Sequence, residues 1–315
     1  MDVSVIIVNW NTKELLRDCL SSVYEYAGDI GYEIIVIDNA SIDGSAEMVK
    51  NDFQQVILME NSDNRGFATA NNQGMAVAKG RYMLLLNSDT VVLDNAIANI
   101  VNFADENPQI AVTGCRVLNP DRTLQRTCFM FPSVLNMLLS STYLYKLFPK
   151  NRFFGREQMT WWNRNDVRQV DVVTGCFMLV RRKAIDQVGM MDEQFFMYSE
   201  ETDWCYRFRE KNWKVMFAPV GQIIHFGGQS TAQKPVAMIV QLRLSILKFM
   251  KKHYCRSTYL IARFLVALFF AIRLPVWLAK GLIRPAARNE AAIKMKAYFT
   301  GVVSALLGRI YSEKI

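Results

Sequence analysis

Residues 82–89 of the chain read YMLLLNSD, an apolar run that ends in three polar residues. A short, unbroken apolar run bounded by turn residues is typical of a strand that is buried on both faces of a parallel sheet. Two segments nearer the N-terminus repeat the pattern, residues 3–8 (VSVIIV) before Asn9 and residues 33–37 (EIIVI) before Asp38. The sequence therefore predicts at least three buried strands, each followed by a polar loop.

Helical patterns separate these strands. Residues 13–26 gather their apolar side chains on one helical face, namely Leu15, Leu16, Cys19, Leu20 and Val23. Residues 46–53 and 68–79 also have helical character, the second ending at Gly80, and residues 56–59 form a further short strand between them. Strands that alternate with helices predict an α/β fold around a mostly parallel sheet.

The polar loops are the candidate binding site, because ligands of open α/β sheets bind beyond the carboxyl ends of the strands. A predicted strand ends just before each of four polar positions, which are Asn9, Asp38, residues 61–66 and residues 87–89. The sequence contains neither a G-x-G-x-x-G nor a G-x-x-x-x-G-K-[ST] motif, which argues against dinucleotide dehydrogenases and nucleoside triphosphatases.

Asp89 is the candidate metal ligand, since its carboxylate follows a rigid strand and Asn87 and Ser88 supply further oxygen atoms. Mg²⁺ or Mn²⁺ is commonly held by one or two carboxylates together with phosphate oxygens. The alternative is an ordinary turn, for which Asn-Ser-Asp is also suitable.

Three acids with helical spacing, Glu200, Glu201 and Asp203, offer a general base, because grouped carboxylates raise one another's pKa. The alternative for them is a solvated helix face. His225 ends an apolar run before two glycines and is either a ligand or a structural hydrogen-bonding residue.

Positive charge is concentrated at the C-terminal end of the chain. The net charge of the 315 residues is +8, yet residues 236–315 alone carry 14 Lys and Arg against two Glu, or +12, which leaves −4 for residues 1–235. Two apolar stretches, residues 259–280 and 297–310, lie among these basic residues, and Arg263 and Arg273 interrupt the first. We expect interfacial helices on an anionic membrane, or alternatively a helical subdomain packed on the rest of the chain, and no nucleic acid.

Seven motifs occur in the same order as in a known family and span residues 3–231. They are SVIIVNWN, DNASIDGS, NRGFATANNQGM, GRYMLLLNSDT, VTGCFMLVRR, FFMYSEETDWCYR and HFGGQST. The sequence resembles glycosyltransferase family 2, particularly its bacterial rhamnosyltransferase-like and galactofuranosyltransferase-like branch. The resemblance implies a GT-A fold, which we assign to residues 1–235. Residues 236–315 lie beyond the matching motifs, and their composition predicts a basic helical extension associated with the membrane.

The resemblance also implies residue roles in an inverting, metal-dependent transfer. Glu201 is the expected base with Glu200 and Asp203 as supporting acids, and Asp89 and His225 are the expected ligands of Mg²⁺ or Mn²⁺. The expected nucleotide-sugar-binding residues are Asn9, Asp38, Asn39, Arg65, Asn71, Asn87, Ser88 and Gly175. Two departures are present: Glu-Glu replaces Glu-Asp at residues 200–201, and Asn-Ser-Asp replaces the two-aspartate metal motif.

The leading hypothesis is a transferase that moves rhamnose from dTDP-rhamnose to a polyprenyl-linked saccharide at the cytoplasmic face of a bacterial inner membrane. One alternative is a galactofuranosyl- or other hexosyltransferase that uses a UDP-sugar. An alternative of another class is an inactive sugar-nucleotide-binding scaffold at the membrane. A homo-oligomer is possible under each hypothesis.

Overall fold

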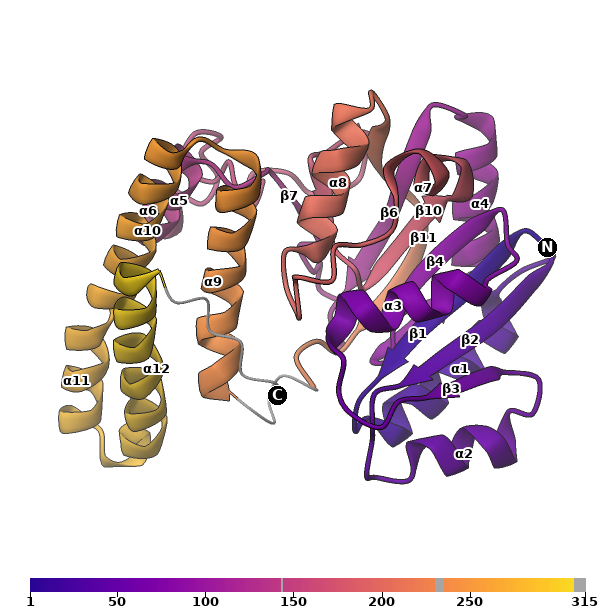
Figure 1. Ribbon diagram of the computed structural model, residues 1–315, viewed down its shortest axis with the longest axis horizontal. Helices are drawn as coiled ribbons and strands as arrows, with labels where there is room; N and C mark the ends of the chain where they lie inside the picture. The colour runs from indigo at the N-terminus through magenta and orange to yellow at the C-terminus, as the bar shows by residue number, and fades with distance from the viewer. Residues whose placement is uncertain (143, 230–234, 309–315) are drawn as a thin grey trace. The chain divides into compact units, whose positions relative to one another are not determined.

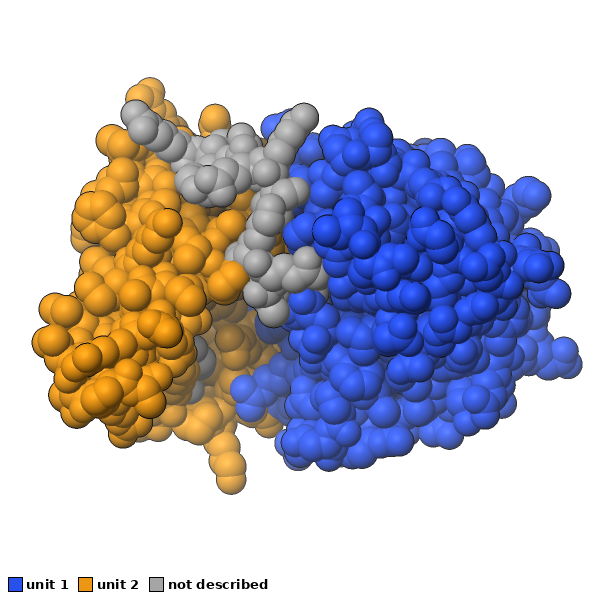
Figure 2. Space-filling model, turned by 90° about the horizontal axis from the view of Figure 1, so that it is seen from below, with its two compact units in different colours: residues 1–130, 162–196, 200–230 blue, residues 131–161, 197–199, 231–315 orange. Residues whose placement is uncertain are grey.

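A computed structural model describes residues 1–142, 144–229 and 235–308. The chain divides into two compact units (Figures 1 and 2). The sheet unit contains residues 1–130, 162–196 and 200–230, and the helical unit contains residues 131–161, 197–199 and 231–315. The helical unit thus includes two segments that precede residue 236. The domain boundary expected from the sequence stays a prediction.

The first half of the sheet unit confirms the predicted alternation of strands and helices, with each element within two residues of its expected bounds. The elements are β1 (Val3–Asn9), α1 (Lys13–Tyr26), β2 (Tyr32–Asp38), α2 (Ser45–Asp52), β3 (Ile57–Glu60), α3 (Gly66–Val77) and β4 (Tyr82–Asn87). β1 pairs in parallel with both β2 and β4, and β3 adds in parallel to β2. Their buried apolar runs follow from this position, since helices cover both faces of a parallel sheet.

The second half of the sheet unit extends the same sheet with strands of mixed direction. Its elements are β5 (Thr90–Leu93), α4 (Ala96–Glu106), β6 (Ile110–Leu118), β7 (Cys128–Phe129), β8 (Arg168–Gln169), β9 (Val172–Val173), β10 (Phe177–Arg181), α7 (Arg182–Val188), α8 (Glu200–Glu210) and β11 (Lys214–His225). The order across the sheet is β3-β2-β1-β4-β10-β6-β11-β5, with β8 beside β11. β10 runs antiparallel to β4 and β6, and β5 runs antiparallel to β11.

The sequence pattern of residues 170–181 suggests one continuous strand, but the structure divides it. β9 leaves the main sheet and pairs with β7 in a separate two-stranded sheet, while β10 pairs with β4. The break falls at residues 174–176, where Gly175 lies against the ring of Phe67. Apolar composition alone does not reveal the break, because both strands are buried.

Alternate residues of the central strands face different layers of the fold. Val3, Val5 and Ile7 of β1 belong to the cluster that also contains Leu16 and Leu20 of α1. Ile6 points to the opposite face, where α3 crosses the sheet (Figure 1). Side chains of a strand point alternately to its two faces, so a strand that is covered on both faces is apolar at almost every position. In β1, before its terminal Asn9, the buried exception is Ser4, whose hydroxyl donates to Glu33.

A glycine permits the close approach of α3 to the sheet. A Cβ atom at Gly74 would lie 2.6 Å from Cγ2 of Ile6 and 2.8 Å from Cδ1 of Ile37. No side chain fits there without a shift of the helix or of these two isoleucines. Because α3 begins at Gly66, directly after the polar loop of residues 61–66, its distance from the sheet also sets the position of that loop.

The helical unit contains α5 (Val134–Ser141), α6 (Leu144–Leu147), α9 (Pro235–His253), α10 (Arg256–Ala271), α11 (Leu274–Ile283), the short 3₁₀ helix η2 (Pro285–Ala287) and α12 (Arg288–Leu307). α12 packs against α9, α10 and α11. Gly301 of α12 lies directly against the ring of Phe270 of α10. The apolar C-terminal stretches predicted from the sequence are therefore helices with a core of their own.

We expect Gly74→Val to lower the free energy of unfolding by about 1–3 kcal/mol, because the added side chain overfills the α3–sheet contact. Urea denaturation followed by circular dichroism measures the change. Ala76→Val on the exposed side of the same helix is the matched control, with an expected change below about 0.5 kcal/mol. Equal effects of the two substitutions would contradict the close packing of α3.

Candidate functional site

The carboxyl ends of three central strands place predicted site residues at one edge of the sheet. Asn9 at the end of β1 is in register with Asp38 at the end of β2. Asn87 at the end of β4 is in register with Val8 of β1. In a parallel sheet, strands that end in register present their following loops together. Figure 1 shows β1, β2 and β4 side by side.

Asn9 and Asp38 are joined in a buried hydrogen-bond network. Nδ2 of Asn9 donates to Oδ1 of Asp38 over 3.0 Å and to Oγ of Ser41 over 3.1 Å. The backbone N–H of Ser41 donates to Oδ2 of Asp38 over 2.9 Å. Both carboxylate oxygens of Asp38 are therefore oriented by donors, which fixes the side chain before a ligand arrives.

Thr12 extends this network to Ser88 and was missed by the sequence analysis. Its hydroxyl donates to Oδ1 of Asn9 over 2.7 Å and lies 2.9 Å from Oγ of Ser88. Thr12 occupies the N-cap of α1, where a threonine normally bonds the first turn, yet its side chain makes no such bond. The sequence signal at this position indicates a helix cap, and only the fold reveals the other use of the hydroxyl.

Asn39 and Asn71 anchor the neighbouring loop around Gly66. Nδ2 of Asn39 donates to the carbonyl oxygen of Gly66 over 3.2 Å, and Oδ1 of Asn39 accepts from Asn61 over 2.8 Å. Nδ2 of Asn71 donates to the carbonyl oxygen of Phe67 over 2.9 Å. Oδ1 of Asn71 is buried and has no hydrogen-bond partner among the described residues. A buried acceptor of this kind is one that a ligand can satisfy.

Arg65 lies at the surface of this loop, whereas Gly175 lies against the ring of Phe67. Nε of Arg65 pairs with Oδ1 of Asp63 over 2.9 Å, and both side chains are about half-exposed. The surface pair contributes little stability and leaves Arg65 able to exchange partners. Gly175 precedes Cys176, whose carbonyl oxygen accepts from the backbone N–H of Asn87. A Cβ atom at Gly175 would press on the ring of Phe67.

Asp89 and His225 lie in contact although 135 residues separate them in the chain. Oδ1 of Asp89 is 3.2 Å from Nε2 of His225, and Nδ2 of Asn87 is also 3.2 Å from Nε2. The antiparallel pairing of β5 with β11 creates the contact, since it places His225 opposite Thr90. A hydrogen bond from the backbone N–H of Phe226 to the carbonyl oxygen of Asp89 secures the same junction.

The Asp89–His225 pair fits a divalent cation that a diphosphate helps to hold. Neighbouring ligands at right angles on an ion with bonds of about 2.1 Å lie about 3 Å apart, close to the observed separation. Among the described residues, no group of three or more His, Cys, Asp or Glu is placed to bind a metal. Two protein ligands suffice only where substrate phosphate oxygens complete the coordination.

The acids of α8 form a third group with unequal environments. Glu200 is buried, and burial together with the charge of Glu201 raises its pKa well above the ordinary value. Asp203 is fully buried and accepts from Nε of Arg207 over 2.8 Å. Arg207 also donates to the carbonyl oxygens of Val188 and Met190. Asp203 therefore supports an ion pair that ties α8 to the loop after α7.

Glu201 is the more exposed member of the Glu200–Glu201 pair. Two consecutive residues with positive φ, Tyr198 and Ser199, precede the pair directly. A positive φ is unfavourable for both residue types, so the turn into α8 depends on the surrounding structure. Oε2 of Glu200 is buried and has no hydrogen-bond partner among the described residues.

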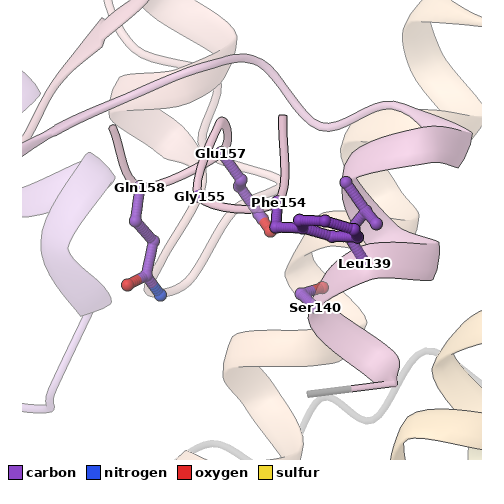
Figure 3. Close-up of a pocket in the computed structure, with 6 residues that line it drawn as sticks. All are labelled: Leu139, Ser140, Phe154, Gly155, Glu157 and Gln158. Atoms are coloured by element: carbon purple, nitrogen blue, oxygen red, sulfur yellow. The ribbon is translucent and has the colours of Figure 1, made fainter. Parts of the chain in front are cut away.

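A separate hollow lies within the helical unit (Figure 3) and contains none of the predicted site residues. Its volume is about 220 Å³ including the open mouth, and its lining is Leu139, Ser140, Phe154, Gly155, Glu157 and Gln158. Small-molecule sites usually measure about 300–1,000 Å³. Burial raises the pKa of Glu157, and the charge of Arg243 opposes that shift. The hollow is too small for a nucleotide sugar.

The sequence model of Glycosyl transferase family 2 matches residues 4–189, more than half of the chain. A relative named N-acetylglucosaminyl-diphospho-decaprenol L-rhamnosyltransferase, from Mycobacterium tuberculosis, is 24% identical over 244 residues and covers 74% of this chain and 78% of its own. The low-salt glycan biosynthesis hexosyltransferase of Haloferax volcanii is 25% identical over 228 residues, or 71% of this chain and 67% of its own.

Solved structures share the fold at lower sequence identity. A mannosyltransferase from Pyrobaculum calidifontis in complex with GDP-Man and Mn²⁺ superposes with a TM-score of 0.59 at 14% identity, covering 98% of this chain and 87% of that one. The structure of GalNAc-T7 with UDP, GalNAc and Mn²⁺ has a TM-score of 0.51 at 17% identity and covers 71% and 43%. These likenesses concern the fold.

We expect Glu200→Gln to stabilise the protein at neutral pH. Folding raises the pKa of this carboxyl, so the carboxyl lowers the free energy of unfolding at pH values above its unfolded pKa, which is near the ordinary value of 4.5. This cost disappears as the pH falls to 4.5. The gain should grow by about 1.4 kcal/mol for each pH unit above that value, until the folded pKa is reached. Thermal unfolding between pH 4.5 and 8 measures it.

Glu210→Gln, at the exposed end of the same helix, is the control and should show no such pH-dependent gain. A loss of stability in Glu200→Gln that grows with pH would mean that Glu200 is ionised in the folded protein.

Proposed function

The chain belongs to Glycosyl transferase family 2 and is a glycosyltransferase with a GT-A fold, and on this basis we propose that it transfers a sugar from a nucleotide-diphosphate donor with inversion. The observation that carries the proposal is the contact of Asp89 with His225 at the sheet edge that also holds Asn9, Asp38 and Ser88. One part of this edge is suited to a nucleoside and the other to a diphosphate with its cation.

The nucleoside part consists of groups fixed in advance. Asp38 is held by Asn9 and by the backbone of Ser41, so its carboxylate can accept from the base or ribose of the donor without rearranging. Asn39 and Asn71 hold the loop around Gly66, and Arg65 can exchange Asp63 for a phosphate. The backbone N–H of Asn87 donates to the carbonyl oxygen of Cys176, and this bond holds Gly175, the residue before Cys176, next to Asn87.

Asp89 and His225 would hold Mg²⁺ or Mn²⁺ against the diphosphate, where the cation offsets the charge that develops on the leaving group. The chain itself contributes the placement of the two ligands. Asp89 follows β4 in a tight turn, and the pairing of β5 with β11 determines the position of His225. Preorganised ligands need no rearrangement as the sugar–phosphate bond breaks.

Glu201 serves as the base in this proposal. The acceptor hydroxyl attacks the anomeric carbon, its proton passes to the carboxylate of Glu201, and the electron pair of the broken carbon–oxygen bond leaves with the diphosphate. Burial and the charge of Glu201 raise the pKa of Glu200, so in this proposal Glu201 is the member of the pair that accepts the proton. Asp203 supports the helix through Arg207 and does not compete for the proton.

For the donor and acceptor we propose rhamnose from dTDP-rhamnose and a polyprenyl-linked saccharide of the cell surface. The name of the mycobacterial relative, which specifies a diphospho-decaprenol acceptor and L-rhamnose, supports this choice. The name of the Haloferax volcanii hexosyltransferase supports the alternative of another hexose. In that alternative we propose a UDP-sugar as the donor. Assays with both donors on a lipid-linked acceptor separate the two.

We propose that the protein lies at the cytoplasmic face of the inner membrane, and features of the helical unit support this position. One stretch in the described part of the chain, Arg256–Ile283, is long and apolar enough to cross a membrane. It contains the boundary between α10 and α11, where Arg273 is buried and bonds the carbonyl oxygens of Ser140 and Ser141. A buried, hydrogen-bonded arginine in the middle of this stretch supports helices that lie in the membrane interface rather than a helix that crosses it.

α11 has the composition of an interfacial helix. It contains no buried residue, and Leu282 and Ile283 at its end are among the most exposed apolar side chains of the chain. Trp277 lies beneath the ammonium groups of Lys280 and Lys294, at 4.0 and 5.9 Å. Aromatic rings flanked by lysines are favourable at the level of lipid headgroups.

The metal and base roles predict opposite kinetic defects. Asp89→Ala should abolish Mn²⁺-dependent binding of the donor, whereas Glu201→Gln should lower transfer by about 10²–10⁴-fold and leave donor affinity within a few-fold. Calorimetry with the nucleotide sugar and a transfer assay measure the two quantities. Asp94→Asn, an exposed aspartate of the turn after β5, is the control. Parallel loss of binding and transfer in Glu201→Gln would exclude it as the base.

The membrane position predicts flotation with vesicles that contain phosphatidylglycerol and weaker flotation with neutral vesicles. Leu282→Ser together with Ile283→Ser should weaken binding by about tenfold or more, since each side chain contributes well over 1 kcal/mol when buried in lipid. Val77→Ser with Val167→Ser, exposed positions of the sheet unit, is the matched control. Failure of the native chain to float would refute the proposal.

A further inference from the structure

Gln125 contacts both the ring and the backbone of His225. It lies between β6 and β7, in a segment that no sequence motif singles out. Its Oε1 is 2.6 Å from Nδ1 of His225, and its Nε2 donates to the carbonyl oxygen of His225 over 3.0 Å. Nε2 also donates to Oδ1 of Asn119 over 2.8 Å, and the backbone N–H of Gln125 donates to Val117.

The orientation of the Gln125 amide follows from these partners. A main-chain carbonyl can only accept, so the NH₂ group of Gln125 must face the carbonyl oxygen of His225. Its oxygen therefore faces Nδ1 of His225. Because that oxygen can only accept, Nδ1 carries the proton of the imidazole ring. The turn of residues 119–123, closed by a hydrogen bond from Asn119 to Thr123, supports this arrangement.

The proton on Nδ1 determines what Nε2 presents to its neighbours. In the neutral ring with Nδ1–H, Nε2 carries a lone pair and no proton. The Nε2 atom lies 3.2 Å from a carboxylate oxygen of Asp89. Two electron-rich atoms at this separation repel each other unless a metal cation or a second ring proton lies between or beside them. Nδ2 of Asn87 donates toward the same lone pair and offsets part of that repulsion.

We infer that Gln125 is a positioning residue that holds His225 as the Nδ1–H tautomer and thereby directs Nε2, together with Asp89, at the divalent cation. The metal part of this inference rests on the proposed function, whereas the tautomer does not. A hydrogen bond from the second ring nitrogen commonly orients histidine ligands, and its loss typically costs 10–100-fold in metal affinity.

Two variants separate the acceptor role of Gln125 from its bulk. Gln125→Met keeps a side chain of similar length and removes the acceptor, so the ring proton should move to Nε2, where Asp89 can accept it. Gln125→Glu keeps an acceptor oxygen and should retain the Nδ1–H tautomer. Gln54→Met, an exposed glutamine after α2, is the control and should leave the tautomer unchanged.

Nitrogen NMR of the full chain labelled with ¹⁵N-histidine reads the tautomer directly. The chain has only two histidines, and His253→Gln assigns the signals. We expect Nδ1–H for His225 in the native protein and in Gln125→Glu, and Nε2–H in Gln125→Met. An Nε2–H tautomer in the native protein, or an unchanged tautomer in Gln125→Met, would overturn the inference.

Titrations of Mn²⁺ in the presence of dTDP and, separately, of UDP, followed by the electron paramagnetic resonance of free Mn²⁺, test the metal part. We expect Gln125→Met to weaken Mn²⁺ binding by about 10–100-fold and Gln125→Glu to bind more tightly than Gln125→Met. Equal Mn²⁺ affinity of the native protein and Gln125→Met would overturn the metal part. Absence of Mn²⁺ binding by the native protein would refute the proposed metal site, while the NMR result would still decide the tautomer.

Discussion

The register between β1 and its two parallel neighbours is the constraint on which the candidate site depends. Asn9 stands beside Asp38, and Val8 beside Asn87, so three polar loops begin at the same height on the sheet. The register is maintained by side chains that are buried on both faces of these strands. A slip by one residue would turn every side chain of a strand to the opposite face. The site is thus positioned by the same packing that stabilises the core.

Four buried acids of the sheet unit are accommodated in different ways, and we assign their roles from this difference. Asp38 accepts from prearranged N–H donors, Asp203 pairs with Arg207, and Glu200 has its pKa raised by burial and by Glu201. Asp89 instead faces an imidazole nitrogen. A buried charge must be compensated by a partner, a proton or a cation. Under the proposed function, Asp89 is the one of these acids compensated by the cation.

The helical unit combines a packed core with an apolar surface. Phe270 and Gly301 join α10 to α12, and the buried Arg273, between α10 and α11, bonds main-chain carbonyls. No residue of α11 is fully buried, although α12 packs against one side of it. The alternative of a packed subdomain therefore describes α9, α10 and α12, and the proposed membrane contact concerns chiefly α11. A basic composition with few acids agrees with anionic headgroups as the partner.

The pattern of apolar runs and polar ends determined the α/β alternation through β4, because burial on two faces leaves a local signature in each strand. The pattern did not predict the break at residues 174–176, since β9 and β10 are both apolar and differ only in their pairing partners. The strand-end position singled out Asp89, and the family resemblance joined His225 to it as a second ligand. Their contact, however, is a product of the pairing of β5 with β11.

Thr12 and Gln125 had no distinguishing pattern at all. A hydroxyl at a helix N-cap and a glutamine in a loop acquire a role only through the atoms that the fold brings to them. The sequence by itself determined which segments become buried strands and which residue types stand at their ends. Only the tertiary structure decided which side chains meet, because hydrogen bonds and ion pairs depend on distances between residues that are far apart in the chain.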